Sequence, residues 1–175
     1  MQLTFRDSPD VAFPGMLADT MYKRTVSRSV GDTAIKPGVI VAEDVDGIVV
    51  PVGTASSVIS GASQHDHTLV GYPTGAAGTN KVVPMWDPKQ TMSVLQRGAI
   101  WLLLATGSTL TNNQRVNVLN TAVAERGYVT QEGAAASEAL PGAMTRSKPF
   151  TLADGRRIIQ VELHAGNYAP APVGG

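Results

Sequence analysis

The stretch MSVLQRGAIWLLL, from Met92 to Leu104, determines the fold that we predict for this chain. It has no proline and one charged residue, and it is too short to cross a bilayer as a helix, which takes roughly 20 apolar residues. Turn-forming residues bound it at 87–89 and 106–108, which is typical of a buried strand, although periodicity alone leaves a buried helix open. Gly98 favours the strand, because mid-strand glycine commonly marks a bulge. We therefore predict one bent central strand, or two short strands that meet at Gly98.

The composition also favours a sheet protein. Charged residues make up 16% of the chain, below the usual figure of about 25%, and only 5% of residues are aromatic. Gly, Pro, Ser, Thr and Val are plentiful, which suits short strands joined by tight turns. The formal net charge of zero gives no electrostatic reason to expect a nucleic-acid partner.

Further short strands are expected along the chain at 39–42, 48–50, 58–61, 69–72, 115–119, 127–130 and 140–146, with a closing hairpin over 151–163. A helix over 114–126 is an alternative to the strand at 115–119. Turn signals spaced roughly 8–12 residues apart indicate an all-β sandwich or barrel. We predict one compact β domain over 33–166, either sandwich- or jelly-roll-like or a small barrel, and a flexible tail at 167–175.

Residues 1–32 differ from the rest of the chain in their hydrophobic pattern. Their large apolar residues are scattered, they are interrupted by Pro9 and Pro14, and they show no sustained period. A short helical turn over 16–24 is possible, but we interpret the region as an irregular, extended N-terminal arm. Such a segment finds its partner surface on its own domain or on a neighbour, and the sequence leaves both open.

Two stretches carry residue types that bind metals. The acidic turn EDVDG at 43–47 lacks the spacing and the distal Glu of a calcium-binding EF-hand loop, which leaves Gln64-His65-Asp66-His67. On a strand His65 and His67 face one side and Asp66 the other, so the three converge only in a loop. The remaining histidine is His164, far along the chain. We interpret the stretch as a polar loop and expect no metal and no other cofactor.

Signatures of catalysis are missing. The chain lacks cysteine, which excludes disulfides and thiolate catalysis, and it has no nucleophile elbow, zinc-protease motif or phosphate-binding loop. The carboxylates lie mostly in turns without the pairing that acid–base work requires. We expect no enzymatic activity. No segment reaches transmembrane length and no signal peptide begins the chain, so we expect no membrane partner and synthesis in a cytoplasm.

Several stretches together resemble the structural cement, or decoration, proteins of tailed bacteriophage capsids. AFPGMLADT (12–20) resembles the N-terminal arm of that family, and SVLQRGAIWLLL (93–104) resembles one of its strands. LPGAMTRS (140–147) and ADGRRIIQVEL (153–163) resemble its terminal hairpin. LTNNQRVNV (110–118) departs from the pattern, with Asn-Asn-Gln where the family usually has Gly-Asp.

The resemblance implies a compact β domain, a jelly roll or related sandwich, on the outer surface of the virion capsid. It implies dimers or trimers that clamp neighbouring capsomers of the major capsid protein against genome pressure, after synthesis in the host bacterial cytoplasm. Its partners would be the major capsid protein and neighbouring copies of itself. The arm would supply the binding residues, namely Phe5, Phe13, Met16, Leu17, Met21, Tyr22, Arg24 and Arg28.

Two other functions remain open from the sequence. One is a different viral tail, fibre or carbohydrate-binding β module, although sugar binders usually display aromatic residues and only Trp86, Trp101 and a few tyrosines are available here. The other is a cupin-like metal enzyme that uses His65, His67 and His164. Stoichiometric bound metal in the purified protein would favour the enzyme.

Overall fold

The computed structural model describes residues 12–19, 22–66, 85–121 and 124–164. These residues form ten strands and no helix, so the all-β prediction is confirmed for them, and none of them belongs to a helix able to span a membrane. The strands are β1 (Arg24–Ser29), β2 (Ile40–Glu43), β3 (Val49–Pro51), β4 (Val58–Ser63), β5 (Thr91–Leu103), β6 (Arg115–Leu119), β7 (Val129–Gln131), β8 (Ser137–Thr145), β9 (Phe150–Thr151) and β10 (Arg157–Leu163).

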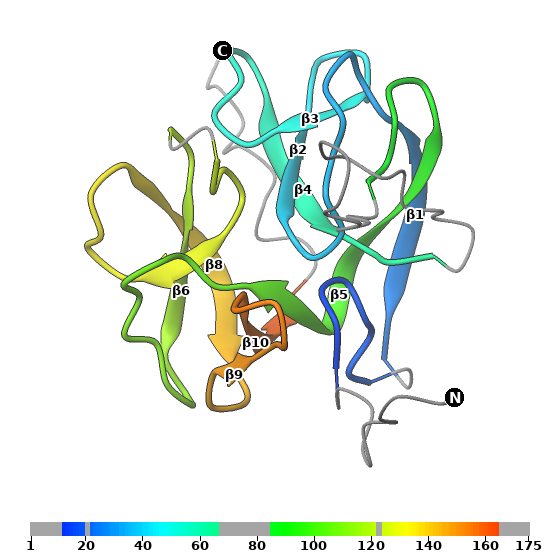
Figure 1. Ribbon diagram of the computed structural model, residues 1–175. Coiled ribbons are helices and arrows are strands. Elements are labelled where there is room, and N and C mark those ends of the chain that lie inside the picture. Colours follow the sequence, from blue (N-terminus) through cyan, green and yellow to red (C-terminus); the bar gives the residue numbers. More distant parts are fainter. Residues whose placement is uncertain (1–11, 20–21, 67–84, 122–123, 165–175) are drawn as a thin grey trace, which may run out of the picture.

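All ten strands belong to one sheet of antiparallel pairs. Its order is β3-β2-β4-β5-β10-β8-β6-β7, while β1 pairs with β5 and β9 pairs with β10. The sheet does not close into a barrel, so the barrel alternative is wrong. Figure 1 shows two halves, with β1 to β4 in one and β6 to β10 in the other, and β5 runs from the first into the second.

The predicted central strand is present as β5, a continuous strand of 13 residues. Its first part lies between β1 and β4, since both Thr25 and Ala62 pair with Leu95. Its second part pairs with β10, from Gly98 opposite Leu163 onward. Because core side chains pack on both faces of β5, its sequence is apolar along most of its length.

A bulge at the middle of β5 turns the strand from one half into the other. Arg24 of β1 pairs with Arg97, whereas the next residue, Thr25, pairs with Leu95, so β5 has one extra residue at this point. The unpaired residue is Gln96, and two positions after it comes Gly98, whose φ is +124°. A glycine accepts this backbone conformation without strain, and bulges increase the local bend and twist of a strand.

The bulge also reverses which side chains face which core. The first core cluster lies on one face of β5 and consists of Ile40, Val52, Ile59, Ala62, Leu95, Ile100, Leu102, Leu104, Leu110, Val116, Val118, Val129, Leu140, Ala143, Ile159, Val161 and Leu163. The second cluster consists of Ala12, Val30, Ile35, Val39, Val41, Val49, Trp86, Met92, Val94, Leu103, Leu152 and Ile158. Even-numbered residues of β5 belong to the second cluster before Gly98 and to the first cluster after it, because one added residue inverts a period of two.

Replacement of Gly98 by alanine should therefore lower the free energy of unfolding by about 2–3 kcal/mol. The new Cβ atom would be strained at φ +124° and would lie 3.3 Å from the carbonyl oxygen of Tyr22. Gly107→Ala is the matched control, since Gly107 has φ +76° in open space, and its expected cost is about 1 kcal/mol. Urea unfolding of both variants measures the difference, and equal losses would contradict the role given to the bulge.

Most of the remaining strands lie where the sequence pattern predicted them. β6 covers the predicted 115–119, so the helix alternative is wrong, and β9 and β10 form the predicted closing hairpin. The strand predicted at 69–72 lies outside the described residues. β1 is the main difference, because residues 24–29 were predicted as irregular arm. β1 forms a strand because it pairs with β5 along its whole length, and its own sequence does not predict a strand.

Candidate interaction surface

The described part of the predicted arm lies on its own domain. The backbone N–H of Gly15 donates to the Trp101 carbonyl at 2.8 Å, and the Trp101 N–H donates back to the Met16 carbonyl at 2.9 Å. The His65 N–H donates to the Gly15 carbonyl at 3.0 Å. Residues 15–18 thus extend the sheet along the edge of β5 that β10 leaves open.

Two glycines make this docking possible. A Cβ atom on Gly15 would lie 2.6 Å from the backbone nitrogen of His65, and one on Gly38 would lie 2.6 Å from the backbone nitrogen of Gly15. Both have positive φ, at +80° and +76°. The backbones approach so closely here that no side chain larger than hydrogen fits between them.

Several predicted binding residues take part in the fold of this chain. Met16 packs against the second core cluster and Leu17 against the first. Arg28 Nε forms an ion pair with Glu43 Oε1 at 3.0 Å, and the Ser60 hydroxyl donates to the same oxygen. This pair is partly exposed and contributes at most about 1 kcal/mol. Phe5 and Met21 lie outside the described residues.

Three predicted binding residues remain accessible. Phe13 is 40% exposed, and its ring meets the ring of His65 edge to face at 4.7 Å between centroids. Tyr22 is 75% exposed, and Arg24 at the start of β1 is also exposed. Exposed aromatic and arginine side chains are the types enriched at protein–protein contacts.

Two neighbours of these residues were not among the predicted binding residues. Lys23 and Arg97 are both exposed and lie beside the bulge with Arg24. Within the part of the chain that the structure describes, none of the three makes an ion pair with a carboxylate. The signal for Arg97 was its place before a glycine inside an apolar strand, where a bulge exposes a charged side chain.

Lys23, Arg24 and Arg97 form a basic cluster, and one of them, Arg97, lines a groove of about 400 Å³. Its lining includes Tyr22 and the charged residues Asp19, Arg97, Arg146 and Glu162. Arg146 already forms an ion pair with Glu162 at 2.5 Å. The groove therefore combines an exposed aromatic ring, a paired arginine and an arginine that forms no ion pair with any described carboxylate.

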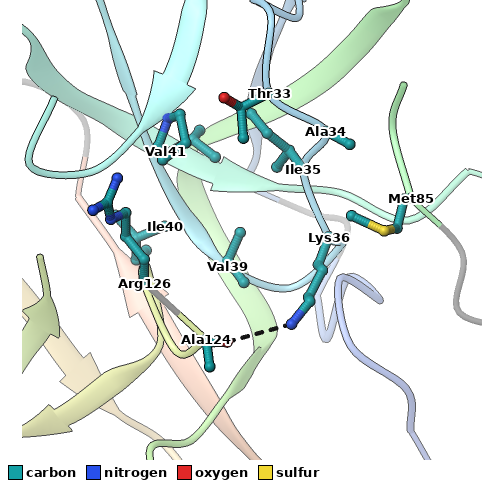
Figure 2. A pocket seen from close by; sticks show the side chains of 11 residues that line it. Thr33, Ala34, Ile35, Lys36, Val39, Ile40, Val41, Met85, Ala124 and Arg126 are labelled. Carbon is teal, nitrogen blue, oxygen red and sulfur yellow. Dashed lines mark hydrogen bonds between the residues drawn. The ribbon is translucent and has the colours of Figure 1, made fainter. Parts of the chain in front are cut away.

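A second, smaller pocket is mainly apolar (Figure 2). It has a volume of about 140 Å³, and Ile35, Val39, Ile40 and Val41 form part of its wall. Lys36 extends beside it and donates to the Ala124 carbonyl at 3.4 Å. No described residue pairs a nucleophile with a base here, so the pocket has the character of a gap between the halves of the sheet.

The polar loop and the tryptophans add no second site. Among the described residues, no group of three or more His, Asp or Glu side chains is placed to hold a metal ion, and His67 lies outside them. His164 lies 3.6 Å from Glu162 instead. Trp86 is buried with its Nε1 donating to the Gln64 carbonyl, and Trp101 packs against the second cluster. Neither ring is presented as a platform for sugar stacking.

The described residues thus form an antiparallel β protein with exposed aromatic and basic side chains beside the bulge of β5. Among solved structures, the chain is similar to one described as "The capsid of Myoviridae Phage XM1", with a TM-score of 0.66 and 16% sequence identity. The match covers 93% of this chain and 98% of that chain, and at this identity it shows a shared fold. No curated protein matches the sequence.

The family model described as "Structural cement protein (E217 gp24/Pam3 gp6)" matches residues 1–164. The chain belongs to this family of phage structural cement proteins, and the resemblance seen in its sequence is confirmed. Membership associates the protein with the phage capsid.

Proposed function

We propose that this protein decorates the outer surface of an assembled phage head and clamps neighbouring capsomers of the major capsid protein against genome pressure. The observation that carries the proposal is the family match over residues 1–164. The fold agrees with such a role, because one sheet with two cores on opposite faces of β5 makes a stiff body.

Cementing requires binding and no chemistry. Each copy needs only modest affinity, because many copies on one shell act together and multivalency raises the effective strength of attachment. Dimers or trimers of the chain would let one particle-bound unit contact two or three capsomers at once. Sedimentation of the isolated protein tests that oligomeric state.

The accessible residues are the contact residues in this proposal. Phe13, Tyr22 and Arg24 would face the shell or a neighbouring copy, and residues 1–11, which include Phe5, would extend the contact. Met16, Leu17 and Arg28 act indirectly, because their contacts hold the N-terminal segment and β1 in place. Deletion of residues 1–28 would remove most of β1 and would be uninformative about binding.

The direct test measures occupancy on shells of the parent phage that lack this protein. Deletion of residues 1–11 and the double change Phe13→Ala with Tyr22→Ala should each weaken binding by roughly tenfold or more, since exposed aromatic contacts at interfaces often contribute more than 1 kcal/mol. Val45→Ala is the control, because Val45 is 84% exposed in the turn between β2 and β3. Undiminished occupancy in both variants would exclude the N-terminal region from the contact.

A further inference from the structure

The basic cluster at the bulge is held together by the backbone. Arg24 and Arg97 are direct partners across β1 and β5. Lys23 lies against the same bulge, since a Cβ atom on Gly98 would be 3.4 Å from both the Cα and the Cβ atoms of Lys23. The backbones of the three cationic residues therefore lie close together, with Arg24 and Arg97 directly opposite each other.

This arrangement is unfavourable for the isolated chain. Like charges directly opposite each other on paired strands destabilise a sheet, and no described carboxylate forms an ion pair with any of the three. Elsewhere in the described residues the protein pairs several of its arginines, as in Arg28 with Glu43 and Arg156 with Asp154. A local conflict of this kind is expected where a residue serves binding and not folding.

The neighbouring groove indicates what kind of anion fits. Its lining includes Ala99 and Leu163 as apolar surface, and Tyr22 is an exposed aromatic residue that lines it together with Arg97. Asp19 and Glu162 also line it. These two carboxylates disfavour a continuous phosphate backbone, whereas separate Asp or Glu side chains can meet Arg97 and Arg24 and avoid them. A guanidinium binds a carboxylate through two parallel N–H bonds.

We propose that the basic cluster and its groove bind an acidic polypeptide segment, with Arg97 and Arg24 each holding a carboxylate and Tyr22 packing on the segment's apolar part. This rests on the proposed function, in which the segment belongs to the shell surface that the protein decorates. Charge complementarity then fixes the orientation of the protein on the shell, because complementary potentials select the register of an interface.

Hexaglutamate is the first probe, titrated into ¹⁵N-labelled protein at low salt. Amide shifts should change at residues 22–24 and 97–99, and the change should disappear in Arg97→Glu. This variant should also raise Tm by about 1–3 °C, because the introduced carboxylate would face Arg24 with opposite charge. Loss of binding together with a gain in stability separates a binding role from misfolding.

Lys89→Glu is the matched control. Lys89 is exposed, makes no ion pair among the described residues, and lies about 25 Å from Arg97 along the strand direction. It makes the same change in net charge and should leave the titration unaltered. Equal loss in Lys89→Glu, no shift at the cluster, or tighter binding of a DNA duplex by the same amides would overturn the proposal.

Rebinding to stripped shells separates this proposal from the proposed function. Arg97→Glu should reduce shell affinity about tenfold and flatten its salt dependence. Wild-type protein that rebinds, with Arg97→Glu unchanged, overturns the acidic-segment contact and leaves cementing intact. Wild-type protein that binds hexaglutamate but no shell overturns the proposed function and supports the acidic-peptide site.

Discussion

Replacement of Gly61 by alanine is expected to prevent stable folding, with a loss of more than about 4 kcal/mol in the free energy of unfolding. The new Cβ atom would lie 2.2 Å from the carbonyl oxygen of Leu95 and 2.9 Å from its carbon. These are backbone atoms of β5, which is held between β1 and β4 at this point. Since packed interiors transmit strain and do not absorb it, no small shift relieves the contact.

Gly133→Ala is the control for this prediction. Gly133 has φ +77° and nothing within 4 Å of an added Cβ atom, so only about 1 kcal/mol of backbone strain is expected. Thermal and urea unfolding compare the two variants. Insoluble Gly61→Ala beside soluble Gly133→Ala agrees with the prediction, while two folded proteins of similar stability would show that β4 and β5 separate more easily than described.

Replacement of Gly38 by alanine is expected to release the N-terminal segment from the domain, at a cost of about 3 kcal/mol. An added Cβ atom would lie 2.6 Å from the backbone nitrogen of Gly15 and 2.6 Å from the Cβ atom of Pro14. Detachment removes the hydrogen bonds between residues 15–18 and β5 and exposes Ala12, which is 1% exposed in the structure. The rest of the sheet keeps its pairing, so the loss should begin as local opening.

Limited proteolysis and hydrogen exchange measure this release. Cleavage near Met16 and Leu17 and fast exchange of the Gly15 and Trp101 amides should appear in Gly38→Ala before global unfolding. Gly47→Ala, with φ +73° and open space around it, should leave both unchanged. Wild-type protection in Gly38→Ala would mean that the close approach of the two glycines is not what holds the segment.

The sequence predicted best those elements whose conformation depends on residues close together in the chain. The apolar run bounded by turns gave β5, and alternation gave β6 at 115–119. The closing hairpin predicted over 151–163 contains Asp154-Gly155, a dipeptide of the kind that forms tight turns on its own. Gly98 was recognised as a bulge or bend, since little else explains glycine within an apolar strand.

The rest depended on contacts between distant residues. β1 has exposed and half-buried side chains in alternation, and only β5, more than 60 positions later, makes it a strand. The sequence shows Pro14 interrupting the N-terminal segment, but the close fit of Gly15 against Gly38 can be seen only in the fold. Arg97 was noted as one charge in an apolar run, and its position opposite Arg24 follows only from the register.

The central place of β5 has a consequence for synthesis. Its partners are β1 and β4, which precede it in the chain, and β10, which ends 60 residues after it at Leu163. The first core needs Leu163 and the second needs Ile158, so neither can be completed until β10 has left the ribosome tunnel, and the chain should fold after that point and not progressively. Pairing over such separations is slow, on the order of milliseconds to seconds, which leaves the nascent chain dependent on chaperones at high expression.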